Sequence, residues 1–168
     1  MSGPATHTLT LPGAMLARGF WLYVWQIDTP KGEYLYVERT GDSSSPRANP
    51  PFTRMSQHLG RKKKSNALKR NLLKKAGVDA EDCELFDLIM HGPIFDEIPH
   101  IGTRDERMEK HKPLRDIVAA MEKQLERDLR EAGYNVLNVV HSRKPLDVAI
   151  WKPVRQAFAE QFERLGNS

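Results

Sequence analysis

Two segments near the N-terminus show the clearest alternation of side chains in the sequence. Residues 21–27 read WLYVWQI and residues 34–39 read YLYVER, and in a strand every second position falls on one face. The first segment is apolar on both faces, which predicts a strand covered on both sides. Residues 28–33 (DTPKGE) contain a proline and a glycine and predict a turn between the two strands.

The expected hairpin brings two tyrosines together. If Asp28 pairs with Glu33 across the turn, then Tyr23 opposes Glu38 and lies on the same face as Tyr36. A slip of one residue would put the two tyrosines on opposite faces of the sheet. Their shared face is therefore a prediction that coordinates can test.

The rest of the chain predicts helices around a further strand. Helices are expected over residues 52–60, 65–76, 113–132 and 146–165, and strand-like runs occupy residues 84–95 and 136–140. Residues 96–111 are charged and have no period, so we expect an irregular segment there. The expected fold class is α/β of the α+β type, with a small, mostly antiparallel three-stranded sheet flanked by helices. Residues 1–18 are expected to be a flexible arm and residues 19–168 a single domain that ends in a helix.

Composition narrows the class of protein. The chain has 168 residues, enough for one domain with a sizeable core. It contains no apolar run near the ~18 residues of a membrane span and no signal-peptide pattern, so no membrane partner is expected. Cys83 is the only cysteine, which excludes an internal disulfide or a cysteine-ligated zinc site. A cytoplasmic location follows as the default.

Positive charge is concentrated in one stretch. The net charge is +4, and residues 61–75 contain basic residues but no acid. The basic residues in this stretch are Arg61, Lys62, Lys63, Lys64, Lys69, Arg70, Lys74 and Lys75. The stretch is either an ordinary solvated helix face or a surface that follows the phosphates of a nucleic acid.

Arg54 and His58 are spaced i, i+4 on the predicted helix that follows the hairpin. The planar guanidinium of an arginine can bond two phosphate oxygens at once. The simpler interpretation is that both residues are exposed polar side chains. Tyr23 and Tyr36 likewise have a simpler interpretation as core residues with a hydroxyl partner at the edge.

The order of these pieces resembles the GIY-YIG nuclease family. The tripeptides at residues 21–23 (WLY) and 36–38 (YVE), the continuation at residues 39–42 (RTGD), and an Arg-x-x-x-His helix follow one another as in that family. Met121-Glu122 in the long predicted helix and the sequence GYNVLN at residues 133–138 are similar to its later landmarks. The resemblance spans roughly residues 19 to 140.

The resemblance implies a metal-dependent endonuclease that hydrolyses phosphodiester bonds in DNA. The implied catalytic residues are Tyr23, Tyr36, Arg54, His58 and Glu122, with Tyr23 as general base or as the residue that orients the attacking water, and Arg54 stabilising the pentavalent phosphate. Glu122 would ligate one Mg²⁺ or Mn²⁺ ion, with Glu126 as the reserve candidate, and Asn138 would support the site structurally. The expected partner is nucleic acid, with DNA preferred over RNA. The residues expected to bind it are Arg39, Arg61, Lys62, Lys63, Lys64, Lys69 and Arg70. The sequence does not indicate an oligomeric state.

Glu38 departs from the family pattern, because glycine is usual at that position. A carboxylate near Tyr23 would either repel the phosphate or add a second metal ligand. The alternative function is therefore a catalytically lapsed domain of the same fold that binds nucleic acid without cutting it. A third hypothesis is a protein-interaction domain whose basic helix is merely solvated.

Overall fold

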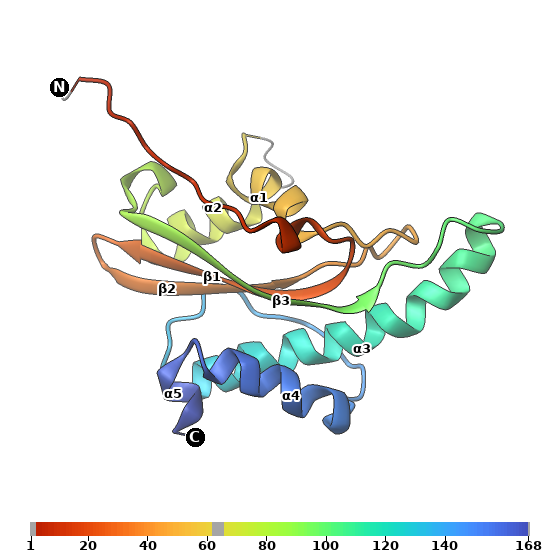
Figure 1. Ribbon diagram of the computed structural model, residues 1–168. Coiled ribbons are helices and arrows are strands. Elements are labelled where there is room, and N and C mark those ends of the chain that lie inside the picture. The colour runs from red at the N-terminus through yellow and green to blue at the C-terminus, as the bar shows by residue number, and fades with distance from the viewer. Residues whose placement is uncertain (1–2, 62–65, 168) are drawn as a thin grey trace.

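A three-stranded antiparallel sheet lies between two layers of helices, and the computed structural model describes residues 3–61 and 66–167 of the chain (Figure 1). Helices α1 (Pro51–Leu59) and α2 (Ala67–Asn71) cover one face of the sheet. Helices α3 (Arg104–Glu131), α4 (Val148–Ala159) and α5 (Glu163–Gly166) cover the other. The predicted α+β class, a small antiparallel sheet flanked by helices, is confirmed.

The hairpin forms in the predicted register. Strand β1 (Gly19–Thr29) pairs with β2 (Gly32–Arg39), so that Tyr23 lies opposite Glu38. Strand β3 (Leu85–Asp96) pairs with the other edge of β1, which gives the order β2-β1-β3. The central strand is buried along almost its whole length, as its two apolar faces predict.

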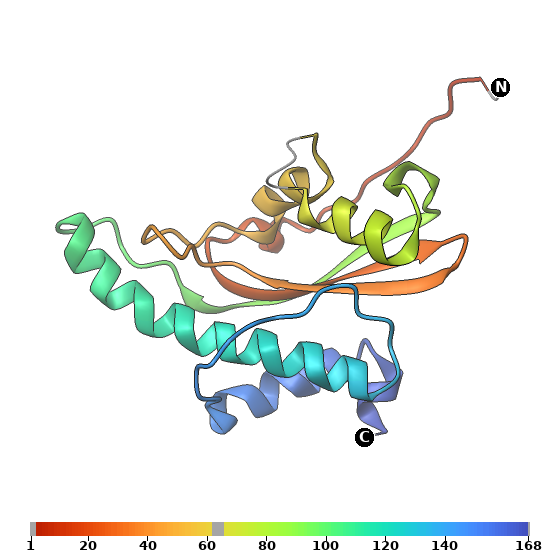
Figure 2. The ribbon, with the colours of Figure 1, turned by 180° about the vertical axis from the view of Figure 1, so that it is seen from behind.

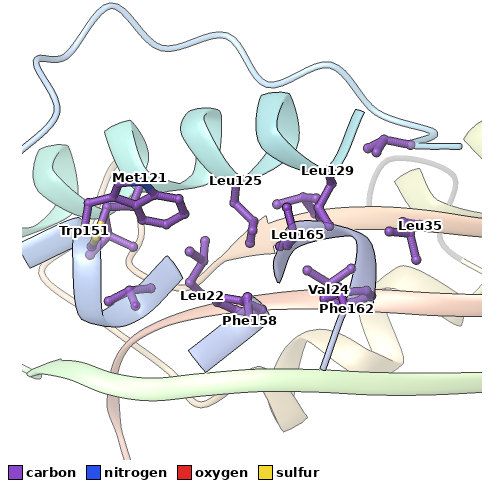
Figure 3. Close-up of a cluster of buried hydrophobic side chains, with 14 of the residues drawn as sticks. Leu22, Val24, Leu35, Met121, Leu125, Leu129, Trp151, Phe158, Phe162 and Leu165 are labelled. Carbon is purple, nitrogen blue, oxygen red and sulfur yellow. The ribbon is translucent and has the colours of Figure 1, made fainter. Parts of the chain in front are cut away.

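Each face of the sheet has its own core. On the α3 side, Leu22 and Val24 pack with α3 and the C-terminal helices, and Figure 3 shows this cluster around Met121, Leu125 and Phe158. The core on the α1 and α2 side contains Tyr23, Trp25, Ile27, Tyr36, Leu68 and Leu72. Because side chains alternate along a strand, the two tyrosines face the first helical layer, whereas the even-numbered residues of β1 face α3.

Helix α3 begins earlier than the sequence analysis predicted. Its first residue is Arg104, because Thr103 accepts a hydrogen bond from the Glu106 amide while the Glu106 carboxylate accepts one from the Thr103 amide. The irregular segment expected over residues 96–111 is therefore wrong for its second half. Pro113, expected in the first turn, lies inside the helix.

The segment after α3 does not form the predicted strand over residues 136–140. It makes one parallel bridge to β2, in which the Leu35 amide donates to the Asn135 carbonyl and the Leu137 amide donates to the Leu35 carbonyl. The side chain of Asn138 then takes the next pairing position on β2, so no further backbone ladder forms there. Figure 2 shows this segment rising from the end of α3 to the sheet.

The remaining helices follow the predictions with shifted ends. Helix α2 continues into a π-helical turn (Leu72–Ala76) that ends at Gly77, as predicted for that region. The final helix predicted over residues 146–165 is interrupted after Ala159, and Pro153, where the sequence suggested an interruption or a start, lies inside α4. None of the helices in the described parts of the chain is long and apolar enough to cross a membrane.

Candidate functional site

Two cavities meet at the edge of β2, and both are lined by Glu38 and Glu122. The first has a volume of about 470 Å³ and lies beside the loop that follows β2, with Arg39 and Arg54 in its wall. The second has a volume of about 620 Å³ and lies towards the π-helical turn, with Tyr36 in its wall. The two cavities therefore gather Tyr36, Arg54 and Glu122 from the predicted catalytic set, and these residues come from β2, α1 and α3.

Glu122 is buried, although it belongs to the helix on the opposite side of the sheet from the tyrosines. Its carboxylate forms an ion pair with Arg39, with 3.1 Å between Oε2 and the Arg39 Nε. Burial, together with the negative charge of Glu38, raises the pKa of Glu122 to about 8. Glu122 reaches both cavities because it lies at the edge of the apolar stripe of α3, next to the buried Met121.

Arg54 lies over Glu38. One terminal nitrogen of Arg54 is 3.7 Å from the Glu38 carboxylate, and its Nε is buried without a hydrogen-bond partner among the described residues. Burial raises the pKa of Glu38, and the positive charge of Arg54 partly opposes that shift. The Arg54 side chain nevertheless lines the first cavity, and a guanidinium at a cavity wall is the arrangement an anion would use.

Tyr23 and His58 form a buried pair. The Tyr23 hydroxyl is 3.1 Å from His58 Nε2, and both side chains are almost completely buried. Burial and the charge of Arg54 lower the pKa of His58 to about 4, so the imidazole is neutral at pH 7 and can accept a hydrogen bond from the phenol. Burial, and then the charge of Glu38, raises the pKa of Tyr23 well above its ordinary value.

The two tyrosines differ in what they face. Tyr36 lines the second cavity, whereas Tyr23 lines neither cavity. The pKa of Tyr36 is also raised, by burial first and then by the charges of Glu38 and Glu122. Both phenols are therefore protonated at neutral pH, and only Tyr36 is placed to contact a molecule in the cavities.

The side chain of Asn138 bonds to the backbone of β2 at a position between two site residues. Its side-chain oxygen accepts from the Val37 amide at 3.0 Å, and its nitrogen donates to the Val37 carbonyl at 2.6 Å. Its own carbonyl accepts from Arg130 of α3. Because Val37 lies between Tyr36 and Glu38, Asn138 fixes the strand that carries both residues and ties it to α3.

The predicted nucleic-acid-binding residues fall into separate groups. Arg39 belongs to the site itself, since it pairs with Glu122 and donates to the Gly41 carbonyl. Arg61 and Arg70 are exposed, whereas Lys69 forms an ion pair with Glu81 at 2.6 Å. Lys62, Lys63 and Lys64 lie outside the described residues.

The role of Arg39 as the partner of Glu122 was not predicted from the sequence. A signal for it was present, because strand alternation puts Arg39 on the same face as Leu35 and Val37, which is the face that α3 covers. The buried position of His111 was also missed, since residues 96–111 were expected to be irregular. The contribution of Ser43, Ser44 and Asn49 to the first cavity carries no sequence signal, because it depends on how the loop folds back.

Glu38 and Glu122 are the residues shared by these cavities that could hold a cation. Within residues 3–61 and 66–167, no group of three or more His, Cys, Asp or Glu side chains is arranged to hold a metal ion by itself. Magnesium keeps several of its waters and is commonly held by one or two carboxylates. Two neighbouring carboxylates, one of which raises the pKa of the other, are a suitable donor set for such an ion.

No family model matches this chain, and neither a curated protein nor a solved structure gives a significant match.

Proposed function

We propose that this protein is a metal-dependent endonuclease that hydrolyses phosphodiester bonds in DNA, with a site of the GIY-YIG type. The observation that carries the proposal is the joint presence of Glu38, Arg54 and Glu122 in the wall of one cavity. These three side chains come from a strand and from helices on opposite sides of the sheet. A guanidinium beside two carboxylates is what in-line attack on a phosphodiester needs.

Arg54 is assigned to the phosphate. In the reaction the oxygen of a water adds to phosphorus, one P–O ester bond breaks, and the products are an alcohol and a phosphate monoester. Negative charge accumulates on the phosphoryl oxygens as the water attacks, and a guanidinium held next to them stabilises that charge. Arg54 lines the first cavity with a side chain that is 37% exposed, so its guanidinium is placed for such an oxygen.

Tyr36 is assigned to the attacking water, and Tyr23 and His58 are assigned to the buried pair that packs against Tyr36. Tyr36 faces the second cavity, so it is the phenol that orients the attacking water or the phosphate. Tyr23 belongs to a buried hydrogen-bonded pair, because its hydroxyl lies 3.1 Å from Nε2 of the neutral His58. Burial raises the pKa of Tyr23 and lowers the pKa of His58, so both groups stay neutral and the imidazole orients the Tyr23 hydroxyl without taking its proton.

Glu122, assisted by Glu38, would hold one Mg²⁺ or Mn²⁺ ion. Both residues supply oxygen ligands at the junction of the two cavities, and their mutual repulsion is relieved by a divalent cation. When bound, the ion would polarise the phosphate and neutralise the leaving oxygen. A cytoplasmic location is part of the same proposal.

Cleavage of supercoiled plasmid DNA with Mg²⁺ or Mn²⁺ tests the proposal. The wild-type protein is expected to nick or linearise the plasmid, and Glu122→Gln is expected to lower the rate by at least about a hundredfold. Glu131→Gln is the matched control, since Glu131 is exposed near the end of the same helix. Equal rates for wild type and Glu122→Gln would remove Glu122 from the mechanism.

A nucleic-acid-binding module that does not cut is the second candidate. The ion pair between Arg54 and Glu38 favours it, because a carboxylate that occupies the guanidinium competes with a phosphate. In that case DNA binding would depend on salt while no cleavage would occur with any divalent ion. Glu38→Gly, which restores the residue usual in the family, would then be expected to create cleavage activity.

A further inference from the structure

The lining of the first cavity includes neutral hydrogen-bonding groups that the proposed function does not use. Ser43, Ser44 and Asn49 line the cavity beside Asp42 of the same loop, whose carboxylate accepts from the Ser45 hydroxyl. Their side chains form no hydrogen bond with another residue in the described part of the chain, and both serines are exposed. Two hydroxyls and an amide that face a polar cavity next to Arg54 are donors suited to a phosphate oxygen.

The loop that carries these groups is held in place by the N-terminal half of α3. His111 Nε2 donates to the Asp42 carbonyl at 2.8 Å, and Arg115 donates to the Ser43 carbonyl at 3.1 Å. Arg104 donates to the carbonyl of Ser44. Three successive carbonyls are thus bound from the α3 side, which leaves the serine hydroxyls free on the cavity side.

The far wall of the second cavity carries cations instead. Lys74 and Lys75, in the π-helical turn, line it together with His141 from the segment after α3. Both lysines are exposed, and neither has an ion-pair partner among the described residues. The two cavities therefore present different chemistry on either side of the carboxylates that they share.

We propose that one polynucleotide strand crosses the edge of β2 from one cavity to the other, an inference that rests on the proposed function. The scissile phosphate lies at the shared Glu38 and Glu122. The neighbouring phosphate on one side is bound by Ser43, Ser44 and Asn49, and the phosphate on the other side is bound by Lys74 and Lys75.

The two groups of residues differ in how salt affects their contribution to DNA binding. A lysine that contacts a phosphate releases counterions, so removing it lowers the slope of log affinity against log salt by about 0.9 for duplex DNA. A neutral donor releases no counterion, so removing it weakens binding without changing the slope. This difference separates the two contacts without any need for a structure of the complex.

The first experiment measures binding of a fluorescein-labelled DNA duplex in Ca²⁺ over a range of salt concentrations. The variant Lys74→Ala/Lys75→Ala is expected to reduce the salt slope by about 1, because both lysines contact the same phosphate. The variant Ser43→Ala/Ser44→Ala/Asn49→Ala is expected to bind about tenfold more weakly with the slope unchanged. Lys152→Ala and Gln156→Ala are the matched controls, because both residues are exposed on α4 in the opposite helical layer.

The second experiment places the contacts relative to the cut. Once the cleaved bond in the duplex is mapped with Mg²⁺, the phosphate on either side of it is replaced by a neutral methylphosphonate. On one side of the cut, the replacement should weaken DNA binding by the wild type but not by the serine and asparagine variant. On the other side, it should weaken DNA binding by the wild type but not by the lysine variant.

The outcomes separate this inference from the function on which it rests. A protein that cuts DNA, but whose two variants respond alike to salt and to both methylphosphonates, would overturn the assigned path while leaving the endonuclease intact. A protein that never cuts under any divalent ion would overturn the endonuclease and the path together. Urea unfolding of each variant confirms that the substitutions leave the fold in place.

Discussion

At the scale of single residues, the pair formed by Tyr23 and His58 has an energetic consequence. The His58 imidazole is 2% exposed, contacts the Tyr23 hydroxyl with Nε2 and leaves Nδ1 without a partner among the described residues. Protonating a ring in this position would bury a charge near Arg54. The folded protein therefore keeps His58 neutral in a pH range where the unfolded chain would protonate it.

This difference in protonation predicts that His58 makes the folded protein less stable in acid. Its pKa is about 4 in the folded protein and 6.5 when unperturbed. Between these values the unfolded chain binds more protons, so stability is fully present above pH 6.5 and is lost as the pH falls to 4. The loss is about 3 kcal/mol. The free energy of unfolding, measured in urea across this range, should fall less steeply for His58→Gln than for wild type.

The measurement compares the wild type with His58→Gln, because His58 is not the only group that makes stability depend on pH. Glu122 has a raised pKa, so it contributes a pH dependence of the opposite sign in both proteins, and only their difference isolates His58. His141→Gln is the control, because His141 is an exposed histidine. Parallel curves for wild type and His58→Gln would contradict the burial of a neutral imidazole.

At the scale of elements, the segment after α3 is what completes the edge of β2. A strand at the edge of a sheet leaves backbone groups unpaired, and here Leu35 is paired by backbone and Val37 by the side chain of Asn138. The carbonyl of Asn138 is bound in turn by Arg130 of α3. The helix that carries Glu122 and the strand that carries Tyr36 are thereby fixed relative to each other.

Asn138→Ala should therefore weaken both the fold and the site. Removing two hydrogen bonds that satisfy partly buried groups is expected to lower the free energy of unfolding by about 1 to 3 kcal/mol. Hydrogen exchange of the Val37 amide should become faster, which a general loss of stability would not confine to that position. Asn167→Ala, beyond α5, is the control, and an unchanged Val37 exchange rate would argue against the edge contact.

The elements also show what the sequence could predict. The hairpin register, the strand over residues 85–96 and the place of Glu122 beside the apolar stripe all follow from local periodicity. The capping box formed by Thr103 and Glu106 is visible in the sequence and could have located the start of α3. It was not recognised, so the burial of His111 on this helix was not predicted either. The cavity wall at Ser43, Ser44 and Asn49 could not be predicted, because long-range contacts from α3 set the shape of that loop.

At the scale of the whole molecule, the three layers bring unlike charges to one place. The first cavity is lined by three carboxylates (Glu38, Asp42 and Glu122) and two guanidinium groups (Arg39 and Arg54). Two of the carboxylates come from β2 and its loop and the third comes from α3, so folding itself forces them together. Their repulsion opposes folding unless a proton or a cation neutralises one of them.

A divalent cation should therefore stabilise the folded protein even when no DNA is present. An ion that binds only the folded state adds a stability of RT ln(1 + [L]/Kd), which is about 2.7 kcal/mol at a hundredfold excess over Kd. The midpoint of thermal unfolding is expected to rise with Mg²⁺ or Mn²⁺ and to return to its starting value when EDTA is added. Glu122→Gln should abolish the rise and Glu38→Gln should reduce it, whereas Glu160→Gln, an exposed position on the C-terminal side of α4, should behave as wild type. A rise of equal size in wild type and Glu122→Gln would mean that the ion binds elsewhere, and the cation would then have no part in the proposed site.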